Sequence, residues 1–196
     1  MVTQRPEPQT APDIVTEVEA QHAVRTLLQY LGEDPDREGL QETPRRVVKA
    51  WDELTAGYSQ TPAELLSTSF DGAGYDQMVV LRQIEFHSTC EHHLLPFSGL
   101  ASVAYIPRRR VVGLSKIARL VDCFARRLQI QEKMTQEIAQ AMMLLKPVGV
   151  GVILSARHMC MSCRGVMKHQ PQMVTSCLLG EFKRAEVREE FFMHCR

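Results

Sequence analysis

The sequence lacks an apolar run that approaches the roughly 18 residues needed by a membrane-spanning helix. It lacks the apolar core of a secretory signal, because its start, MVTQRPEPQTAPD, is polar and rich in proline. It also lacks net charge, since 23 Lys and Arg balance 23 Asp and Glu. These absences argue against a membrane protein, a secreted protein and a nucleic-acid-binding protein. We therefore expect a cytoplasmic protein whose thiols stay reduced.

What is present is a chain of 196 residues, of which 44% are hydrophobic, enough for one good-sized domain or for a domain with a helical appendage. Residues 1–12 hold three prolines and little apolar content, which predicts a disordered arm. Over residues 13–70, apolar residues recur at helical spacing, Gly32 is placed to end the first helix, and two Thr-Pro pairs signal helix starts. We expect an N-terminal helical region there.

Residues 71–196 change character and predict a second domain, of mixed structure. Four segments have the apolar, β-branched or alternating pattern of strands: 78–86, 99–106, 148–156 and 173–179. Three have the pattern of helices: 114–128, 130–145 and 186–194. A turn is expected over 107–110. The order strand, strand, helix, helix, strand, strand is typical of the α+β class.

Two short motifs carry the ligands that zinc prefers, CEHH at 90–93 and HMCMSCR at 158–164. A Cys-x-x-His pair offers a thiolate and an imidazole within one turn, and a second segment must complete a tetrahedral site. The spacing supports two sites equally. One is a closed structural site of Cys90, His93, Cys160 and Cys163. The other is an open catalytic site that leaves Cys163 out.

Two observations favour the open site. His92 and His158 lie beside the ligands and are spare, which suits proton transfer near neutral pH. In addition, if Cys160 lies on an extended segment, the side chain of Cys163 points to the opposite face. The fourth position is then open for a water molecule that zinc makes nucleophilic.

Basic residues elsewhere suggest an anion site. Residues 113–116, GLSK, open the first amphipathic helix, and a helix N-terminus attracts anions. Lys116 and Arg119 share a polar side of that helix, and Arg164 follows the second metal motif, so the three could bind a polyphosphate. A solvated basic helix face is the simpler alternative. Glu132 could accept two N–H bonds from a guanine edge, although for a lone Glu in a first helical turn a favourable contact with the helix dipole is the preferred explanation.

Several segments resemble GTP cyclohydrolase I and follow the order of that family: EGLQETPRRVVKAW, STCEHHLLPFSG, VAYIPRRRVVGLSKIARLV, RRLQIQEKMTQEIA, HMCMSCRG and TSCLLGEF. The resemblance covers nearly all of the chain after the first dozen residues. It implies the tunnelling fold (T-fold), an antiparallel sheet with two helices on one face. It also implies a homodecamer with active sites between subunits. The implied reaction converts GTP and water to 7,8-dihydroneopterin triphosphate and formate, the first step of tetrahydrofolate and pterin biosynthesis.

The resemblance also implies a role for each matching residue. The implied zinc ligands are Cys90, His93 and Cys160. The implied catalytic residues are His92, His158, Ser115 and Gln131. The implied substrate contacts are Glu132, Lys116, Arg119 and Arg164, with Glu132 anchoring the guanine and the basic residues contacting the triphosphate. In the implied mechanism, water activated by zinc attacks C8 of GTP with help from the two histidines, and Ser115 acts near the ribose. Cys163 departs from the family pattern and is expected to be a bystander.

Alternatives stay open beside this interpretation. One is a protein in which zinc is purely structural. Another is a different reaction on the same fold, such as that of a nitrile reductase, which would need a cysteine nucleophile and nicotinamide recognition. A paralogue with altered activity is the third. The sequence does not distinguish folate synthesis from other pterin pathways.

Overall fold

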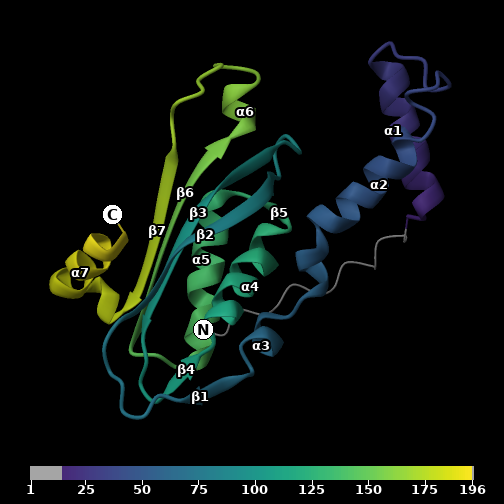
Figure 1. Cartoon of the computed structure of the whole chain (residues 1–196). Helices are drawn as coiled ribbons and strands as arrows, with labels where there is room; N and C mark the ends of the chain where they lie inside the picture. The colour runs from purple at the N-terminus through teal and green to yellow at the C-terminus, as the bar shows by residue number, and fades with distance from the viewer. Residues whose placement is uncertain (1–14, 196) are drawn as a thin grey trace, which may run out of the picture. The chain divides into compact units, whose positions relative to one another are not determined.

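The computed structural model describes residues 15–195 and is drawn in Figure 1. The arm expected over residues 1–12 lies outside the described residues. Contacts divide the chain into two compact units, residues 1–53 and 54–196, and each is described by itself. The domain boundary expected near residue 70 stays a prediction. In the described part of the chain, no helix combines the length and apolarity that crossing a membrane requires.

The first unit is built on the helices α1 (Glu17–Tyr30) and α2 (Thr43–Leu54). A capping box begins α1: the Thr16 hydroxyl accepts from the Glu19 amide (3.3 Å), and the Glu19 carboxylate accepts from the Thr16 amide (2.8 Å). Gly32 ends this helix in the left-handed conformation, with φ of +82°, as the sequence predicted. Local signals of the sequence therefore account for both ends of α1.

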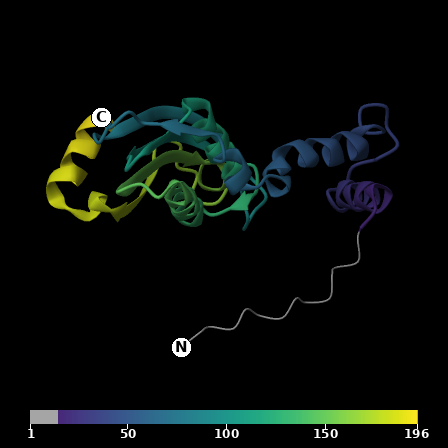
Figure 2. The ribbon, with the colours of Figure 1, turned by 90° about the horizontal axis from the view of Figure 1, so that it is seen from below.

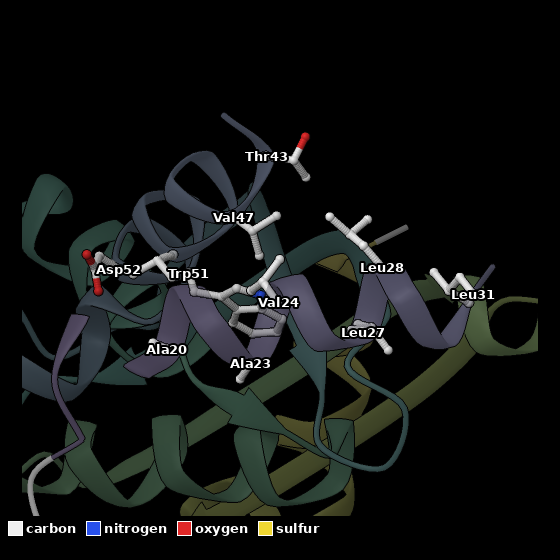
Figure 3. A pocket seen from close by; sticks show the side chains of 11 residues that line it. Ala20, Ala23, Val24, Leu27, Leu28, Leu31, Thr43, Val47, Trp51 and Asp52 are labelled. Carbon is white, nitrogen blue, oxygen red and sulfur yellow. The ribbon is translucent and has the colours of Figure 1, made fainter. Parts of the chain in front are cut away.

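An apolar groove of about 490 Å³ lies between α1 and α2 (Figure 3). Side chains such as Val24, Leu28, Val47 and Trp51 line it, and no residue of α1 is buried. Two short helices offer too little surface to enclose each other's apolar stripes. The groove contains none of the metal-ligating residues predicted from the sequence.

The second unit contains a five-stranded sheet with strand order β5-β2-β3-β6-β7. Its strands are β2 (Val79–Cys90), β3 (Pro96–Ile106), β5 (Leu128–Gln129), β6 (Gly149–His158) and β7 (Met173–Gly180). Neighbouring strands are antiparallel, except that β5 runs parallel to β2. The four strands expected from the sequence are thus confirmed. Figure 2 views the strands roughly end-on and shows that the sheet curls.

Three short strands were not predicted. One is β5; the others, β1 (Ser69–Asp71) and β4 (Arg110–Val112), form a separate two-stranded sheet. Strands of two or three residues are too short to show the alternation on which prediction rests. Consequently Arg110, expected in a turn, is the first residue of β4.

Helices α4 (Leu114–Ala125) and α5 (Gln131–Met142) cover one face of the five-stranded sheet. Ala101, Val103 and Tyr105 of β3 face them and join Ile117 and Ile138 in the main core, each at most 1% exposed. This is the expected α+β arrangement of the T-fold: a sheet that is antiparallel apart from β5, with two helices on one face and a helical segment that precedes it in the chain (Figure 1).

The opposite face of the sheet is partly covered by α7 (Ala185–Cys195). Phe182 and Phe191 pack edge to face over Ala104 of β3, with their ring centroids 5.4 Å apart. The remaining helical segments are short: α3 (Pro62–Leu65), α6 (Met159–Ser162) and the 3₁₀ turns Ala56–Ser59, Met143–Leu145 and Glu181–Lys183. The expected terminal helix is confirmed.

Candidate metal centre and active-site pocket

The turn between β2 and β3 presents the first metal motif. Cys90 is the last residue of β2, and its amide donates to the carbonyl of Leu95 (2.9 Å). Leu94 closes the turn with a positive φ of 54° and donates to the carbonyl of Cys90 (2.9 Å). This single turn brings Cys90 Sγ to 3.8 Å from His93 Nδ1 and 4.0 Å from His92 Nδ1.

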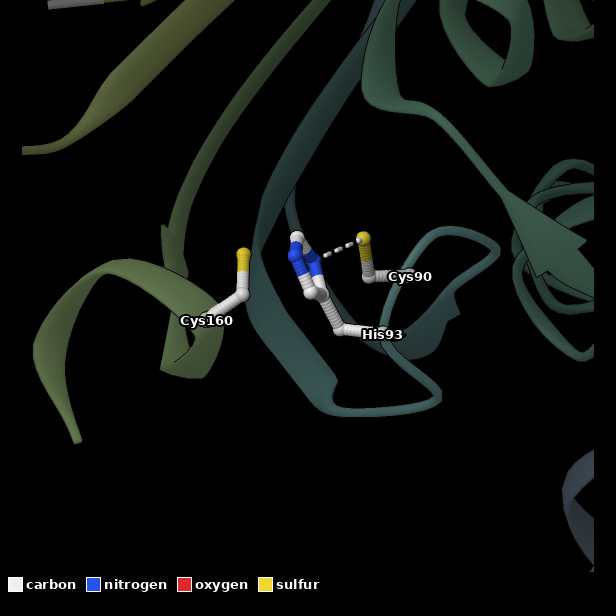
Figure 4. A group of neighbouring side chains, drawn as sticks. All are labelled: Cys90, His93 and Cys160. Atoms are coloured by element: carbon white, nitrogen blue, oxygen red, sulfur yellow. Dashed lines mark hydrogen bonds between the residues drawn. The ribbon is translucent and has the colours of Figure 1, made fainter. Parts of the chain in front are cut away.

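Strand pairing brings the second motif to the first. Phe97 of β3 pairs with His158 at the end of β6, so α6, which follows β6, begins beside the β2–β3 turn. As a result the ligand atoms of Cys90, His93 and Cys160 all lie within 4.8 Å of one another. Figure 4 shows the two sulfur atoms and the imidazole pointing toward a common centre.

The three side chains fit a zinc ion. In a tetrahedral site with ordinary zinc–sulfur and zinc–nitrogen bonds, ligand atoms are about 3.5–3.8 Å apart. Cys90 Sγ and His93 Nδ1 are 3.8 Å apart, and no pair of ligand atoms in the group is more than 4.8 Å apart. Two thiolates and an imidazole are also a donor set that zinc favours. Burial raises the pKa of the Cys160 thiol, the neighbouring Cys90 raises it further, and Arg164 opposes the rise. Two ionised thiols therefore need a cation between them.

Cys163 lies outside this group, but for a reason other than the expected one. The sequence argument applied only if Cys160 lay on an extended segment, and that condition is not met, because Cys160 is in the short helix α6. Cys163 follows the last residue of that helix and is exposed. The four-residue helix was not predicted, because one turn is too short to show helical periodicity.

A pocket of about 240 Å³ opens beside the metal group. It is lined by Cys90, His92, His93, Gln129, Ile130, Gln131, Glu132, His158, Cys160 and Met173. The structure thus brings the predicted ligands together with both spare histidines and with the first two residues of α5. Residues from three separate regions of the sequence meet in one concave site.

His158 is held on two sides in this pocket. Its ring stacks on the buried ring of Phe97, with centroids 4.4 Å apart and planes 5° from parallel. Its Nε2 lies 2.9 Å from Gln131 Oε1. Burial lowers the pKa of His158, while the nearby Glu132 carboxylate acts in the opposite direction. The neutral imidazole is therefore favoured, which is the form that can accept a proton.

The remaining predicted residues do not line the pocket. Ser115 and Lys116 are in the first turn of α4 and Arg119 is near its middle, whereas the end of α4 leads through β5 to Cys90. A helix of 12 residues is about 18 Å long, so the start of α4 is far from the metal group of the same chain. Arg164 is exposed in the segment after α6.

Sequence reasoning missed Gln129, which lies in the two-residue strand β5 and lines the pocket. It is 1% exposed, and its amide donates to the carbonyl of Phe124 (3.1 Å) and to Glu137 (2.8 Å). Its Oε1 is buried, with no hydrogen-bond partner among the described residues. A glutamine in so short a strand carries no pattern that would have revealed it.

Comparisons with known proteins show the family of the chain. A family model described as GTP cyclohydrolase I matches residues 20–196. A relative from Wolinella succinogenes named GTP cyclohydrolase 1 is 55% identical over 178 residues, which cover 90% of this chain and 95% of the relative. One of the same name from Brucella canis is 55% identical over 177 residues, covering 89% of this chain and 83% of that protein. The apo crystal structure of an archaeosine synthase QueF-Like matches 53% of this chain and 93% of its own, at 19% identity and a TM-score of 0.44.

Proposed function

The chain belongs to the GTP cyclohydrolase I family, and from this we propose that it converts GTP and water to 7,8-dihydroneopterin triphosphate and formate. The observation that carries the proposal is the convergence of Cys90, His93 and Cys160 with His92 and His158 around one pocket. Opening an imidazole ring by hydrolysis needs an activated water and groups that move protons. The Cys90, His93 and Cys160 side chains would hold the metal that activates the water, and two histidines beside them can move protons. The product would enter tetrahydrofolate or other pterin synthesis.

We propose that Cys90, His93 and Cys160 hold Zn²⁺. The spacing and type of their ligand atoms support this ion. When bound, zinc would supply Lewis acidity and activate water at an open fourth position. Thiolate ligation requires reduced cysteines, which supports our proposal that the protein works in the cytoplasm.

The pocket residues have the chemistry for the remaining steps. His158 is favoured as a neutral imidazole and His92 is exposed beside Cys90, so both can transfer protons to or from the opening ring. Glu132 is exposed in the first turn of α5, where its carboxylate can accept the N–H groups of a guanine edge. Gln131 lies at the pocket wall and contacts His158.

We propose that each site is completed by a second copy of the chain within a homo-oligomer, a decamer by family resemblance. The support is the separation within one chain: the start of α4 lies about a helix length, roughly 18 Å, from the end that approaches Cys90. Ser115, Lys116 and Arg119 would then contribute to the pocket of a neighbouring copy. There the positive charges of Lys116 and Arg119 would contact the triphosphate. Arg164, whose charge acts on Cys160, would join them from the metal side.

The test is incubation of the zinc-loaded protein with GTP, with formate and pterin fluorescence as the two readouts. We expect both to appear together, and to stop when a chelator removes the metal and return when zinc is restored. GTP left intact by fully metal-loaded protein would overturn the proposed activity.

The rival interpretation, a purely structural zinc site, predicts a different coordination shell. X-ray absorption at the zinc edge should show two sulfur atoms, one nitrogen and one oxygen for the proposed enzyme. Three sulfur atoms would mean that Cys163 fills the fourth position, as the structural interpretation requires.

A further inference from the structure

A polar network is buried behind the pocket, and neither the sequence motifs nor the proposed mechanism accounts for it. Gln131 and Thr135 of α5 are each 1% exposed, and Thr175 of β7 is half-buried. The Gln131 amide nitrogen lies 2.9 Å from the carbonyl of Met173, 3.2 Å from that of Leu154 and 3.0 Å from Thr175 Oγ1. Buried polar groups in such number point to a positioning role.

The two carbonyl oxygens fix which way the Gln131 amide faces. A carbonyl can only accept a hydrogen bond, so the group that faces Met173 and Leu154 must be the NH₂. The amide oxygen therefore faces His158, at 2.9 Å from Nε2. Turning the amide over would set its oxygen against two carbonyl oxygens and leave buried groups unpaired, which is costly.

The two threonines give the network a single direction. Thr135 Oγ1 lies 2.6 Å from the carbonyl of Gln131, so the Thr135 hydroxyl must donate its proton there. The 2.6 Å contact between the two hydroxyls then requires Thr175 to donate to Thr135. Thr175 Oγ1 is left as an acceptor and receives the Gln131 NH₂. Each threonine hydroxyl thus has one acceptor, and the two hydrogens of the Gln131 NH₂ are shared among Thr175 Oγ1 and the two carbonyls.

Because Gln131 Oε1 can only accept, the proton of the neutral His158 ring is on Nε2 and the lone pair is on Nδ1. We propose that Thr135 and Thr175 are positioning residues that, through Gln131, hold the His158 ring with its Nε2–H donated to Gln131 Oε1, so that the lone pair is on Nδ1 when the ring is neutral. Stacking on Phe97 fixes the plane of the ring, and the hydrogen bond to Gln131 fixes its rotation within that plane. The inference rests on the proposed function at one point only, because it is that function which requires His158 to transfer a proton.

The first test is the tautomer itself, measured without GTP on the zinc-loaded full-length protein. Magic-angle-spinning ¹⁵N NMR of histidine-labelled protein distinguishes a protonated from an unprotonated ring nitrogen, and the His158 signals are those lost in His158→Asn. We expect a neutral ring with hydrogen on Nε2. A ring with hydrogen on Nδ1, or a ring mixed between tautomers, would overturn the inference.

The second test separates positioning from packing. Thr175→Val keeps the shape of the side chain but removes the hydrogen bonds of Thr175 Oγ1 to Gln131 and Thr135. We therefore expect kcat to fall about two- to tenfold with KM nearly unchanged, and faster solvent exchange of the His158 Nε2 proton. Thr175→Ser, which restores the hydroxyl, should recover both values. Equal behaviour of the valine and serine variants would mean that Thr175 only packs. If GTP is untouched by the wild type while the tautomer is as expected, the proposed function fails and the hydrogen-bond assignment stands.

Discussion

His92 and His93 are adjacent in the sequence, and their imidazoles lie at similar distances from Cys90 Sγ, 4.0 and 3.8 Å. Only His93 also comes within 4.8 Å of the Cys160 ligand atom as part of the three-residue group. The turn after β2 therefore gives the two histidines different positions. The His93 ring faces the metal centre, and the His92 ring is available for other chemistry at the pocket.

This division predicts different outcomes for the two histidines. His92→Ala should keep its zinc and lose turnover by about 10²- to 10⁴-fold, the range for removal of a general acid or base. His93→Ala should lose the metal. Zinc content by atomic emission, together with formate release, checks both variants. Loss of zinc from His92→Ala would show that the ligand assignment is reversed.

The two cysteines of the second motif should also differ. Cys160 belongs to the metal group, whereas Cys163 is exposed and outside it. We expect Cys163→Ala to retain full zinc content and nearly full activity, and Cys160→Ala to lose both. Metal stoichiometry after gel filtration measures the difference, and zinc-free Cys163→Ala would establish it as a fourth ligand.

At the scale of helices and strands, close approach of the sheet to α7 depends on a glycine. A Cβ placed on Gly151 of β6 would lie 2.5 Å from the Phe182 ring and 2.9 Å from that of Phe191. Both rings are fully buried, so they have little room to move. The pairing of the two rings over β3 and β6 thus requires the absence of a side chain at this position.

Gly151→Ala should therefore destabilise the protein by about 1–3 kcal/mol through overpacking. Urea denaturation of the variant measures the loss. Phe182→Leu makes room for the added methyl group, so the double variant should be more stable than the sum of the two single changes predicts. Strict additivity of the two losses would show that the methyl group does not meet the ring.

How far the sequence could predict these elements depended on their length. The strand over 148–156 and the helix begun at Leu114 were predictable, because each is long enough to show its period. β5 and α6 were not, since two and four residues show no period. Yet these two place Gln129 and Cys160 in the pocket. The metal-ligating residues could be recognised from the two motifs. The pairing of Phe97 with His158, which brings the motifs together, is a contact between residues far apart in the sequence.

For the whole molecule, the position of α4 decides how many chains make one site. Lys116 is near the start of a helix whose other end leads to the metal group, so one chain cannot easily present both to the same GTP. If sites form between copies, a subunit defective at the metal and a subunit defective at the anion-binding end can complement each other. If each site belongs to one chain, they cannot.

Mixed oligomers test this directly. We expect Cys90→Ala and Lys116→Ala each to be inactive alone. Equal amounts of the two variants, refolded or co-expressed together, should recover about one quarter of wild-type activity. The reason is that one site in four then combines an intact metal group with an intact Lys116 from the neighbouring copy. Mixing the two assembled proteins without exchange of subunits is the control and should give no activity. Co-expressed hybrids that contain both subunits but stay inactive would place Lys116 and the metal group of each site on the same chain.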